Sequence, residues 1–505
     1  MVNNNTDPRL SEQGMTQACQ AIKQDPKNAQ AWFERGWLHF MRKEYPQSIS
    51  DFDRCIALDP THALAFANRG DAHCNIGDSE RALSDASEAI RLDTNSPYTW
   101  HVRGRAYLMR GENALAIHDL NKAILLLPHS PPSYALRSEA YFQMGDIDHS
   151  IADASEAIRM ACGDAYAWTV RGWGYYAKGE YQNAISDFTE SLEIDPSNVW
   201  ARTGRSNAYC RNGAVEMALA DAEEVVRRSP NYGYGWATRG RAFFAKRDFQ
   251  LALRDFNEAI RLDPSDAESY AGRGIAFYCM RDYDKAIVEA DEAIRLRPSY
   301  GYGWIVRGWS FLDRGESEKA IADFTETIRL EPQNAEPFCG RGEAHFARQD
   351  YASALQDFTE AVRLRPAYAR AYFKRGQSHY SHNHDYDAAA VDCTEAIRLD
   401  PNYGHAYIVR ANAYRHLGKY EEAMSDYATA IKLMPNDSWV YISRGIAHKY
   451  EGDIDLAIAD FNEAIRLSPT WARAYSLRGK AYLSKGDMAL ASADLMEADR
   501  LELGS

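Results

Sequence analysis

Residues 165–198 read AYAWTVRGWGYYAKGEYQNAISDFTESLEIDPSN, and the pattern of these 34 residues indicates the fold class. Its first half places Trp168, Gly172 and Tyr175 at i, i+4 and i+7, which is the spacing of one face of a helix. In its second half, Ala184 and Phe188 begin another stripe of the same period. The stretch therefore predicts two short helices that pack against each other.

The same pattern continues in both directions from this stretch. Counted from Ala29, the chain divides into fourteen units, thirteen of 34 residues and one of 35. Internal repeats of this period override the number of domains that length alone would predict. The predicted units are 29–62, 63–96, 97–130, 131–164, 165–198, 199–232, 233–266, 267–300, 301–334, 335–368, 369–403, 404–437, 438–471 and 472–505.

Residues that begin and end helices recur at fixed positions of the repeat. With positions numbered 1 to 34 within a unit, position 15 is Gly in nine units, where a left-handed residue ends a helix. Position 16 is Asp or Glu in twelve units, where a second helix begins and its dipole favours negative charge. Position 32 is Pro in eleven units, which ends the second helix. Each unit is therefore predicted to be helix–turn–helix.

This pattern resembles the tetratricopeptide repeat family over residues 29–505, and residues 11–28 resemble the second helix of a preceding unit. We therefore describe residues 1–28 as an N-terminal segment that ends in a half-repeat helix. The resemblance implies an all-α fold, a right-handed superhelical α-solenoid whose first helices line a concave groove. Unit 369–403 departs from the pattern, since an extra residue within Ser381–Asp385 lengthens its turn.

Composition restricts the possible partners. The formal net charge of −14 disfavours a nucleic-acid binder or an anionic-membrane binder, because both need a positive field. No stretch is long and apolar enough to insert in a membrane, and the N-terminus lacks the features of a signal peptide. The eight cysteines form no CxxC pair and are interpreted as reduced thiols, which predicts a cytoplasmic protein.

An arginine and an acid recur together. Position 7 is Arg in all fourteen units, and position 23 is Asp in thirteen and Glu289 in the other. One interpretation is an arginine ladder that captures phosphate or carboxylate groups. The matching stoichiometry favours the other, a structural Arg–Asp pair within each unit, because a buried charge needs its partner.

Catalysis and cofactor binding find no support in the motifs. The segment 378–387 contains His379, His382, His384 and Asp385, but His379 occupies position 11, where other units also carry histidine in the predicted core. We therefore predict no metal site there. The sequence contains no nucleophile elbow, glycine-rich phosphate loop or HExxH motif, so we predict no enzyme activity and no cofactor.

Residues that bind a partner are expected at positions where the residue type varies from unit to unit. Positions 2, 5, 6, 9, 12 and 13 form one stripe of the first helix, and the resemblance implies that this stripe faces the groove. Its aromatic candidates are Tyr98, Phe142, Tyr166, Trp173, Tyr176, Trp200, Tyr234 and Phe244. Its acidic candidates are Glu268, Asp313, Glu336 and Glu343. Its basic candidates are Arg370, Lys374, Arg415, Lys449, Arg473 and Lys480. The alternative for any single aromatic residue is that it only packs against a neighbouring unit.

These features predict a scaffold or adaptor that binds an extended peptide or a partner helix. The expected partner is a protein or peptide with an apolar or aromatic segment and an acidic segment. The alternative is a targeting or regulatory arm of an enzyme complex, with the catalytic domain on another chain or missing from this one. A nucleic-acid reader is disfavoured, because no pair of base-reading positions recurs in every unit. The sequence does not determine the oligomeric state.

Overall fold

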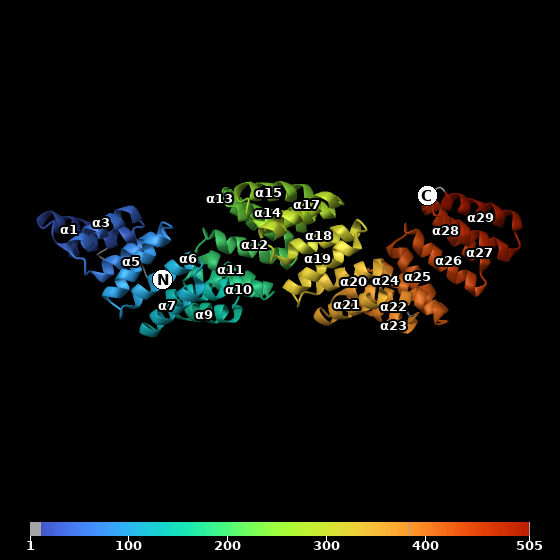
Figure 1. Cartoon of the computed structure of the whole chain (residues 1–505), viewed down its shortest axis with the longest axis horizontal. Helices are drawn as coiled ribbons and strands as arrows, with labels where there is room; N and C mark the ends of the chain where they lie inside the picture. Colours follow the sequence, from blue (N-terminus) through green and yellow to red (C-terminus); the bar gives the residue numbers. More distant parts are fainter. Residues whose placement is uncertain (1–11, 383, 504–505) are drawn as a thin grey trace. The chain divides into compact units, whose positions relative to one another are not determined.

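The computed structural model describes residues 12–382 and 384–503, which divide by contact into two compact units. The first unit ends at Pro264 and the second begins at Ser265, in the turn between the seventh and eighth repeats. The repeat pattern of the sequence predicts one uninterrupted run of fourteen repeats, without such a division. Figure 1 shows the helices of each unit in chain order.

In the first unit, a single helix precedes seven hairpins. This helix is α1 (Glu12–Gln24), and it contacts the first helix of the first hairpin, as the predicted half-repeat requires. The first helices of the hairpins are α2 (Ala29–Met41), α4 (Ala63–Asn75), α6 (Pro97–Met109), α8 (Pro131–Gln143), α10 (Ala165–Ala177), α12 (Val199–Arg211) and α14 (Gly233–Ala245). The second helices are α3 (Tyr45–Leu58), α5 (Ser79–Leu92), α7 (Asn113–Leu126), α9 (Ile147–Met160), α11 (Tyr181–Ile194), α13 (Val215–Arg228) and α15 (Phe249–Leu262).

The second unit contains seven further hairpins. Their first helices are α16 (Ala267–Cys279), α18 (Gly301–Asp313), α20 (Ala335–Ala347), α22 (Ala369–His382), α24 (Gly404–His416), α26 (Ser438–Glu451) and α28 (Ala472–Lys485). Their second helices are α17 (Tyr283–Leu296), α19 (Ser317–Leu330), α21 (Tyr351–Leu364), α23 (Tyr386–Leu399), α25 (Tyr420–Leu433), α27 (Ile454–Leu467) and α29 (Met488–Leu503). The predicted fold class, an all-α solenoid of helix–turn–helix repeats, is confirmed.

The turn inside each hairpin needs one left-handed residue. Nine units supply Gly at this point, for example Gly179 with φ of 77°. The other five supply Lys43, Arg247, Arg281, Gln349 or His384, all with φ between 51° and 65°. The second helix then begins, and where position 16 is Asp its carboxylate often accepts a hydrogen bond from a backbone N–H of the first turn, as Asp78 does from Arg81 at 3.1 Å.

Close approach of the two helices depends on a missing side chain. In the fifth hairpin, Phe188 of α11 is fully buried against Gly172 of α10. A Cβ atom on Gly172 would lie 2.7 Å from Cε1 of the Phe188 ring, which is closer than real Cβ atoms come. The small residue at position 8 therefore makes room for the aromatic residue at position 24.

Neighbouring hairpins are tied together through the aromatic residue at position 4. In the first repeat, the indole nitrogen of Trp32 donates to the carbonyl of Pro26 at 3.0 Å. Arg202 is the one non-aromatic residue at this position, and its Nη2 donates to the equivalent carbonyl, that of Pro196, at 2.9 Å. The substitution thus removes the ring but keeps the hydrogen bond between repeats.

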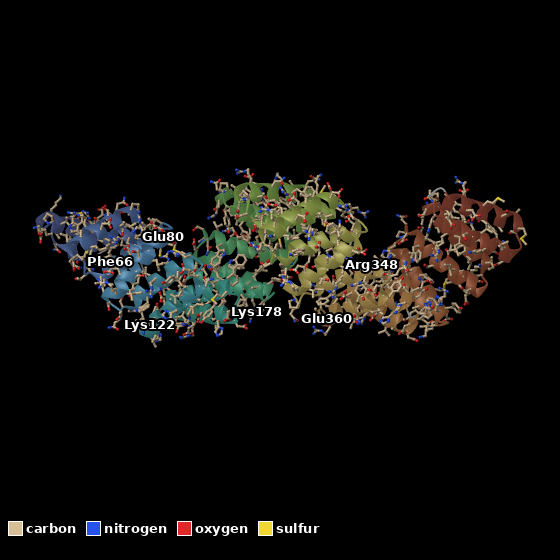
Figure 2. The ribbon with its side chains drawn as sticks, in the orientation of Figure 1. Phe66, Glu80, Lys122, Lys178, Arg348 and Glu360 are labelled. Atoms are coloured by element: carbon tan, nitrogen blue, oxygen red, sulfur yellow. The ribbon has the colours of Figure 1, made fainter. Side chains whose placement is uncertain are left out.

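Salt bridges cross the same boundary on the exposed edge. Lys178, labelled in Figure 2, pairs with Asp148 of the preceding hairpin. Arg348, also labelled there, pairs with Glu318 at 3.3 Å. Exposed pairs of this kind contribute little stability each, roughly 0–1 kcal/mol. Throughout the part of the chain that the structure describes, no helix is both long and apolar enough to cross a bilayer.

Candidate protein-binding surface

Each unit exposes a face built from its first helices. Successive first helices contact each other directly, as α4 does α6 and α8 does α10. Among the described residues, the second helices of successive hairpins make no such contact. Elements on the inner side of a curved stack lie closer together than those on the outer side, so within each unit the first helices occupy the inner face. The predicted stripe of positions 2, 5, 6, 9, 12 and 13 belongs to these helices.

Most of the aromatic candidates gather around one cluster in the first unit. The ring of Trp173 is stacked with that of Trp200, with centroids 6.2 Å apart, and meets the ring of Tyr176 edge-on at 5.5 Å. Tyr166 lies 6.0 Å from Trp200 on the other side. Phe142 and Tyr234 pack against the same core. We call Tyr166, Tyr176 and Trp200, which are partly exposed, the aromatic surface.

Trp173 differs from its neighbours because it is buried. Only 7% of its surface is exposed, and its ring packs edge-on against Phe188 of the hairpin core. For this residue the alternative interpretation, packing between repeats, describes the observed position. Its contribution to an interface would therefore be indirect, through support of Trp200.

The two remaining aromatic candidates lie outside the cluster. The Tyr98 hydroxyl donates to Oδ2 of Asp71 at 2.9 Å, and Arg105 forms an ion pair with the same carboxylate. The Phe244 ring packs against that of Phe249 at 5.6 Å, at the turn of its own hairpin. Asp71 and Arg105 were not among the predicted site residues, although both occupy position 9 of the predicted stripe.

In the second unit, acidic and basic candidates pair with each other. Glu343, 9% exposed, accepts from Nε of Arg370 at 2.6 Å and from Nη2 at 3.0 Å. Lys374 lies 3.2 Å from the same carboxylate, and the Arg370 guanidinium lies over the ring of Trp309 at 4.5 Å. Glu343 is one of the acidic candidates, and Arg370 and Lys374 are basic candidates. The facing helices α20 and α22 bring their charges together.

Two of the other acidic candidates also have partners. Asp313 accepts a hydrogen bond from the hydroxyl of Tyr278 at 2.8 Å. Glu268 lies 3.3 Å from Nη1 of Arg297. Glu336 lies in the first turn of α20, where its backbone N–H donates to Oδ1 of Asn334 at 3.0 Å. The carboxylates of Asp313 and Glu268 are therefore already engaged by partners within the fold.

Four basic candidates remain without a carboxylate within 4 Å among the residues the structure describes. They are Arg415, Lys449, Arg473 and Lys480, from α24, α26 and α28, and we call them the basic surface. Arg415 lies over the ring of Tyr450 at 5.1 Å, and Arg473 over that of Trp439 at 5.4 Å. Both of these rings are exposed.

The recurring arginine at position 7 is structural. In thirteen units its guanidinium donates from both Nε and Nη2 to the Asp at position 23, as Arg171 does to Asp187 at 2.7 and 2.9 Å. In the eighth unit Arg273 pairs with Glu289 at 2.6 Å. Several of these arginines also lie over the ring at position 4, as Arg69 does over that of Phe66 at 5.5 Å. Phe66 is labelled in Figure 2. The Arg–Asp interpretation is confirmed, and these arginines are not a ladder facing a ligand.

The histidines of segment 378–387 go to different partners. His379 Nε2 lies 3.9 Å from Asp392, while the rings of His382 and His384 pack on Tyr351 and Tyr386. Across residues 12–382 and 384–503, no three metal-ligating side chains are grouped so that they could hold an ion. Position 383 itself is outside the described residues.

Comparison with protein families agrees with this geometry. The chain belongs to the tetratricopeptide repeat family. Families described as "TPR repeat" or "Tetratricopeptide repeat" match residues 29–62, 52–84, 131–161, 165–198, 237–301, 342–383, 393–424, 411–452, 447–486 and 472–503. The "Protein prenyltransferase alpha subunit repeat" family matches residues 12–41. A chain of this family and fold is typical of protein-interaction scaffolds.

The search of solved structures gives a more particular likeness. The chain is similar to a chain from the crystal structure of the APC/C hetero-tetramer Cut9-Hcn1, with a TM-score of 0.58 and 15% sequence identity. The alignment covers 92% of this chain and 98% of that one. At this identity the likeness concerns the fold alone. No curated protein matches the sequence significantly.

Proposed function

We propose that the chain is an interaction scaffold that binds an extended peptide or a partner helix on the inner faces of its units. The observation that carries this proposal is the aromatic surface of the first unit. Tyr166, Tyr176 and Trp200 form one cluster on the inner helices, and each leaves part of its side chain exposed. Aromatic residues in such positions are enriched among the residues that dominate binding energy.

The proposed partner has two parts of different chemistry. Its apolar or aromatic segment would pack on the aromatic surface, which offers flat rings with polar edges. Its acidic segment would meet the basic surface, where four positive side chains lack a carboxylate of their own among the described residues. The Cut9 structure comes from a hetero-tetramer that also contains Hcn1, which is in keeping with a chain of this fold working in an assembly.

The experiment has two steps. The full chain, immobilised, captures partners from a native lysate, and mass spectrometry identifies them. The affinity of the purified partner is then measured for the wild-type chain, for Trp200→Ala, and for Arg473→Glu with Lys480→Glu. The proposal expects both variants to bind more weakly while keeping the helical content of the wild type. Unchanged affinity in both would place binding on the outer helices instead.

A further inference from the structure

Two hollows lie on the inner face of the first unit, between α6, α8 and α10. One has a volume of about 800 Å³ and reaches from His101 to Asp164. The other has a volume of about 480 Å³ and reaches Glu139. Both are lined by Arg105, Leu136 and Tyr166, so we treat them as one site, the Glu139 hollow.

At this site, a contact between side chains of successive repeats that occurs elsewhere in the chain is not formed. A side chain at position 9 meets the one at position 2 of the next repeat, 27 residues later. Examples of such pairs in direct contact are Asp71 with Tyr98, Trp173 with Trp200, Asn207 with Tyr234, and Glu343 with Arg370. Glu139 and Tyr166 have the same separation but no mutual hydrogen bond within the described residues, and both line the hollow.

The positive groups around the hollow are already neutralised. Arg105 forms an ion pair with Asp71, and its Nη2 donates to Oδ1 of Asn75 at 3.1 Å. His101 lies within 3.0 Å of the Ser133 hydroxyl, and burial lowers the pKa of its imidazole to about 4. His101 is therefore neutral at pH 7. Arg110 also lines the hollow and pairs with Glu112 at 2.6 Å, so none of the three groups offers a free positive charge to a ligand.

Within residues 12–382 and 384–503, the carboxylates of the hollow have no cationic partner. Glu139 accepts a hydrogen bond from Nε2 of Gln143 at 3.0 Å, and Asp164 accepts one from the backbone N–H of Tyr166 at 3.0 Å. Neither has a Lys, Arg or His nitrogen within 4 Å in the part of the chain described, and burial raises the pKa of both. Burial disfavours the ionised form of these carboxylates, and a cation bound beside them would stabilise that form.

We propose that the Glu139 hollow binds a lysine or arginine side chain carried by the partner segment. Its aliphatic stem would lie on Leu136 and Pro132, and its charged end would face Glu139 beside the ring of Tyr166. This inference rests on the proposed function, because it assumes that the inner face binds a peptide. The partner would then carry a basic residue next to the apolar segment that packs on the aromatic surface.

The test uses a library of random 12-residue peptides displayed on phage and selected on the full chain. Selected peptides are synthesised, and those whose affinity falls with Trp200→Ala are kept as inner-face binders. We expect these peptides to contain Arg or Lys, and neutralising that residue, as citrulline or norleucine, to weaken binding about tenfold, as for close charge pairs across an interface. Glu139→Gln, which keeps the shape and the Gln143 contact, should weaken the unmodified peptide to the same extent.

Coupling between the two changes decides the outcome. If the peptide cation lies against Glu139, the neutral peptide should bind wild type and Glu139→Gln equally, since the second change has nothing left to remove. Affinity of the unmodified peptide should also rise with pH as Glu139 ionises, and should rise less in Glu139→Gln, where Asp164 is the hollow carboxylate that still ionises. Glu190→Gln, an exposed acid on α11 of the same unit, is the matched control and should leave affinity unchanged.

The possible failures are distinct. Peptides that depend on Trp200 but lack basic residues, or whose cation does not couple to Glu139, would overturn the inference and leave the proposed function standing. Peptides with an acidic residue that couples to Arg105 would also overturn it. If no selected peptide depends on Trp200, Glu139 or Arg105, both the inference and the inner-face proposal for this unit fail.

Discussion

Arg370 and Glu343 lie 27 residues apart and face each other across two successive inner helices. Nε and Nη2 of the guanidinium donate to the two oxygens of the carboxylate at 2.6 and 3.0 Å. Lys374 approaches the same carboxylate at 3.2 Å. Because Glu343 is only 9% exposed, its negative charge needs these two cations nearby. The three residues therefore stabilise the fold and are not free for a ligand.

The first prediction separates paired from unpaired cations in the second unit. Arg370→Glu with Lys374→Glu should lower the free energy of unfolding by about 3 kcal/mol or more, because it surrounds a buried carboxylate with like charges. Arg473→Glu with Lys480→Glu makes the same change in charge on exposed residues and should leave stability nearly unchanged. Urea denaturation of both variants gives the comparison, and equal stability loss would contradict it.

The second prediction concerns association with an acidic partner segment. Arg473→Glu with Lys480→Glu should slow association by about tenfold at low salt and flatten its dependence on salt, since exposed charges steer encounter. Dissociation should change less. Surface plasmon resonance with the captured partner at several salt concentrations measures both rates, and a salt dependence equal to that of wild type would show that the basic surface does not face the partner.

The third prediction distinguishes the two stacked tryptophans. Trp173→Ala should cost about 3–5 kcal/mol of stability, because it empties a buried site in the core of the fifth hairpin. Trp200→Ala should cost less stability and instead speed dissociation of an apolar partner segment. Trp200→Phe keeps a ring and serves as the control. A Trp200→Ala variant with wild-type dissociation would exclude this ring from the interface.

The fourth prediction addresses the recurring ion pair. Arg239 donates to the fully buried Asp255 at 2.5 and 2.9 Å, so Arg239→Met should lower stability by about 3 kcal/mol. Partner affinity should be unchanged. Adding Asp255→Leu removes the stranded carboxylate and should recover part of the loss. Thermal denaturation and binding are measured together, and a variant with normal melting but no binding would favour a ligand-facing role.

The fifth prediction tests locality of folding. Ala252 of α15 is fully buried, so Ala252→Leu should overpack its hairpin at a cost of about 1–3 kcal/mol. Hydrogen exchange should lose protection in α14 and α15, while α2 to α9 stay protected, because each repeat contacts only its neighbours. Simultaneous loss of protection throughout the unit would show that it unfolds as a single cooperative globule.

The sixth prediction is a pH dependence of stability. Burial lowers the pKa of His101 to about 4, so the unfolded chain takes up a proton at this residue, near pH 6.5, before the folded chain does. Stability is therefore lost as pH falls from about 6.5 to 4, by about 1–3 kcal/mol for this residue. His101→Asn should remove that part of the loss. Denaturation at pH 7, 5.5 and 4 tests it, and identical pH profiles would contradict it.

The repeat and its local chemistry could be predicted from the amino-acid sequence. The 34-residue period fixed where helices begin and end, because caps, left-handed turn residues and apolar stripes act within a few residues of each other. It also identified the Arg–Asp pair, because Arg at position 7 and an acid at position 23 recur together in every unit, and Arg171 and Asp187 bond in this way. Because these features recur in many units, the units of this one chain can be compared with each other in place of related sequences.

Which residues of the stripe are available to a partner depends on contacts between repeats and could not be predicted from the sequence. Trp173 is buried, Glu343 is held by Arg370, and Tyr98 is held by Asp71, although all occupy positions that the repeat leaves free. An offset of 27 residues between positions 9 and 2 was a signal in the sequence, but it does not say whether a given pair closes. Whether the pair forms a contact depends on the length, charge and rotamer of two side chains on facing helices. Glu343 and Arg370 form a hydrogen-bonded ion pair, whereas Glu139 and Tyr166 line a hollow.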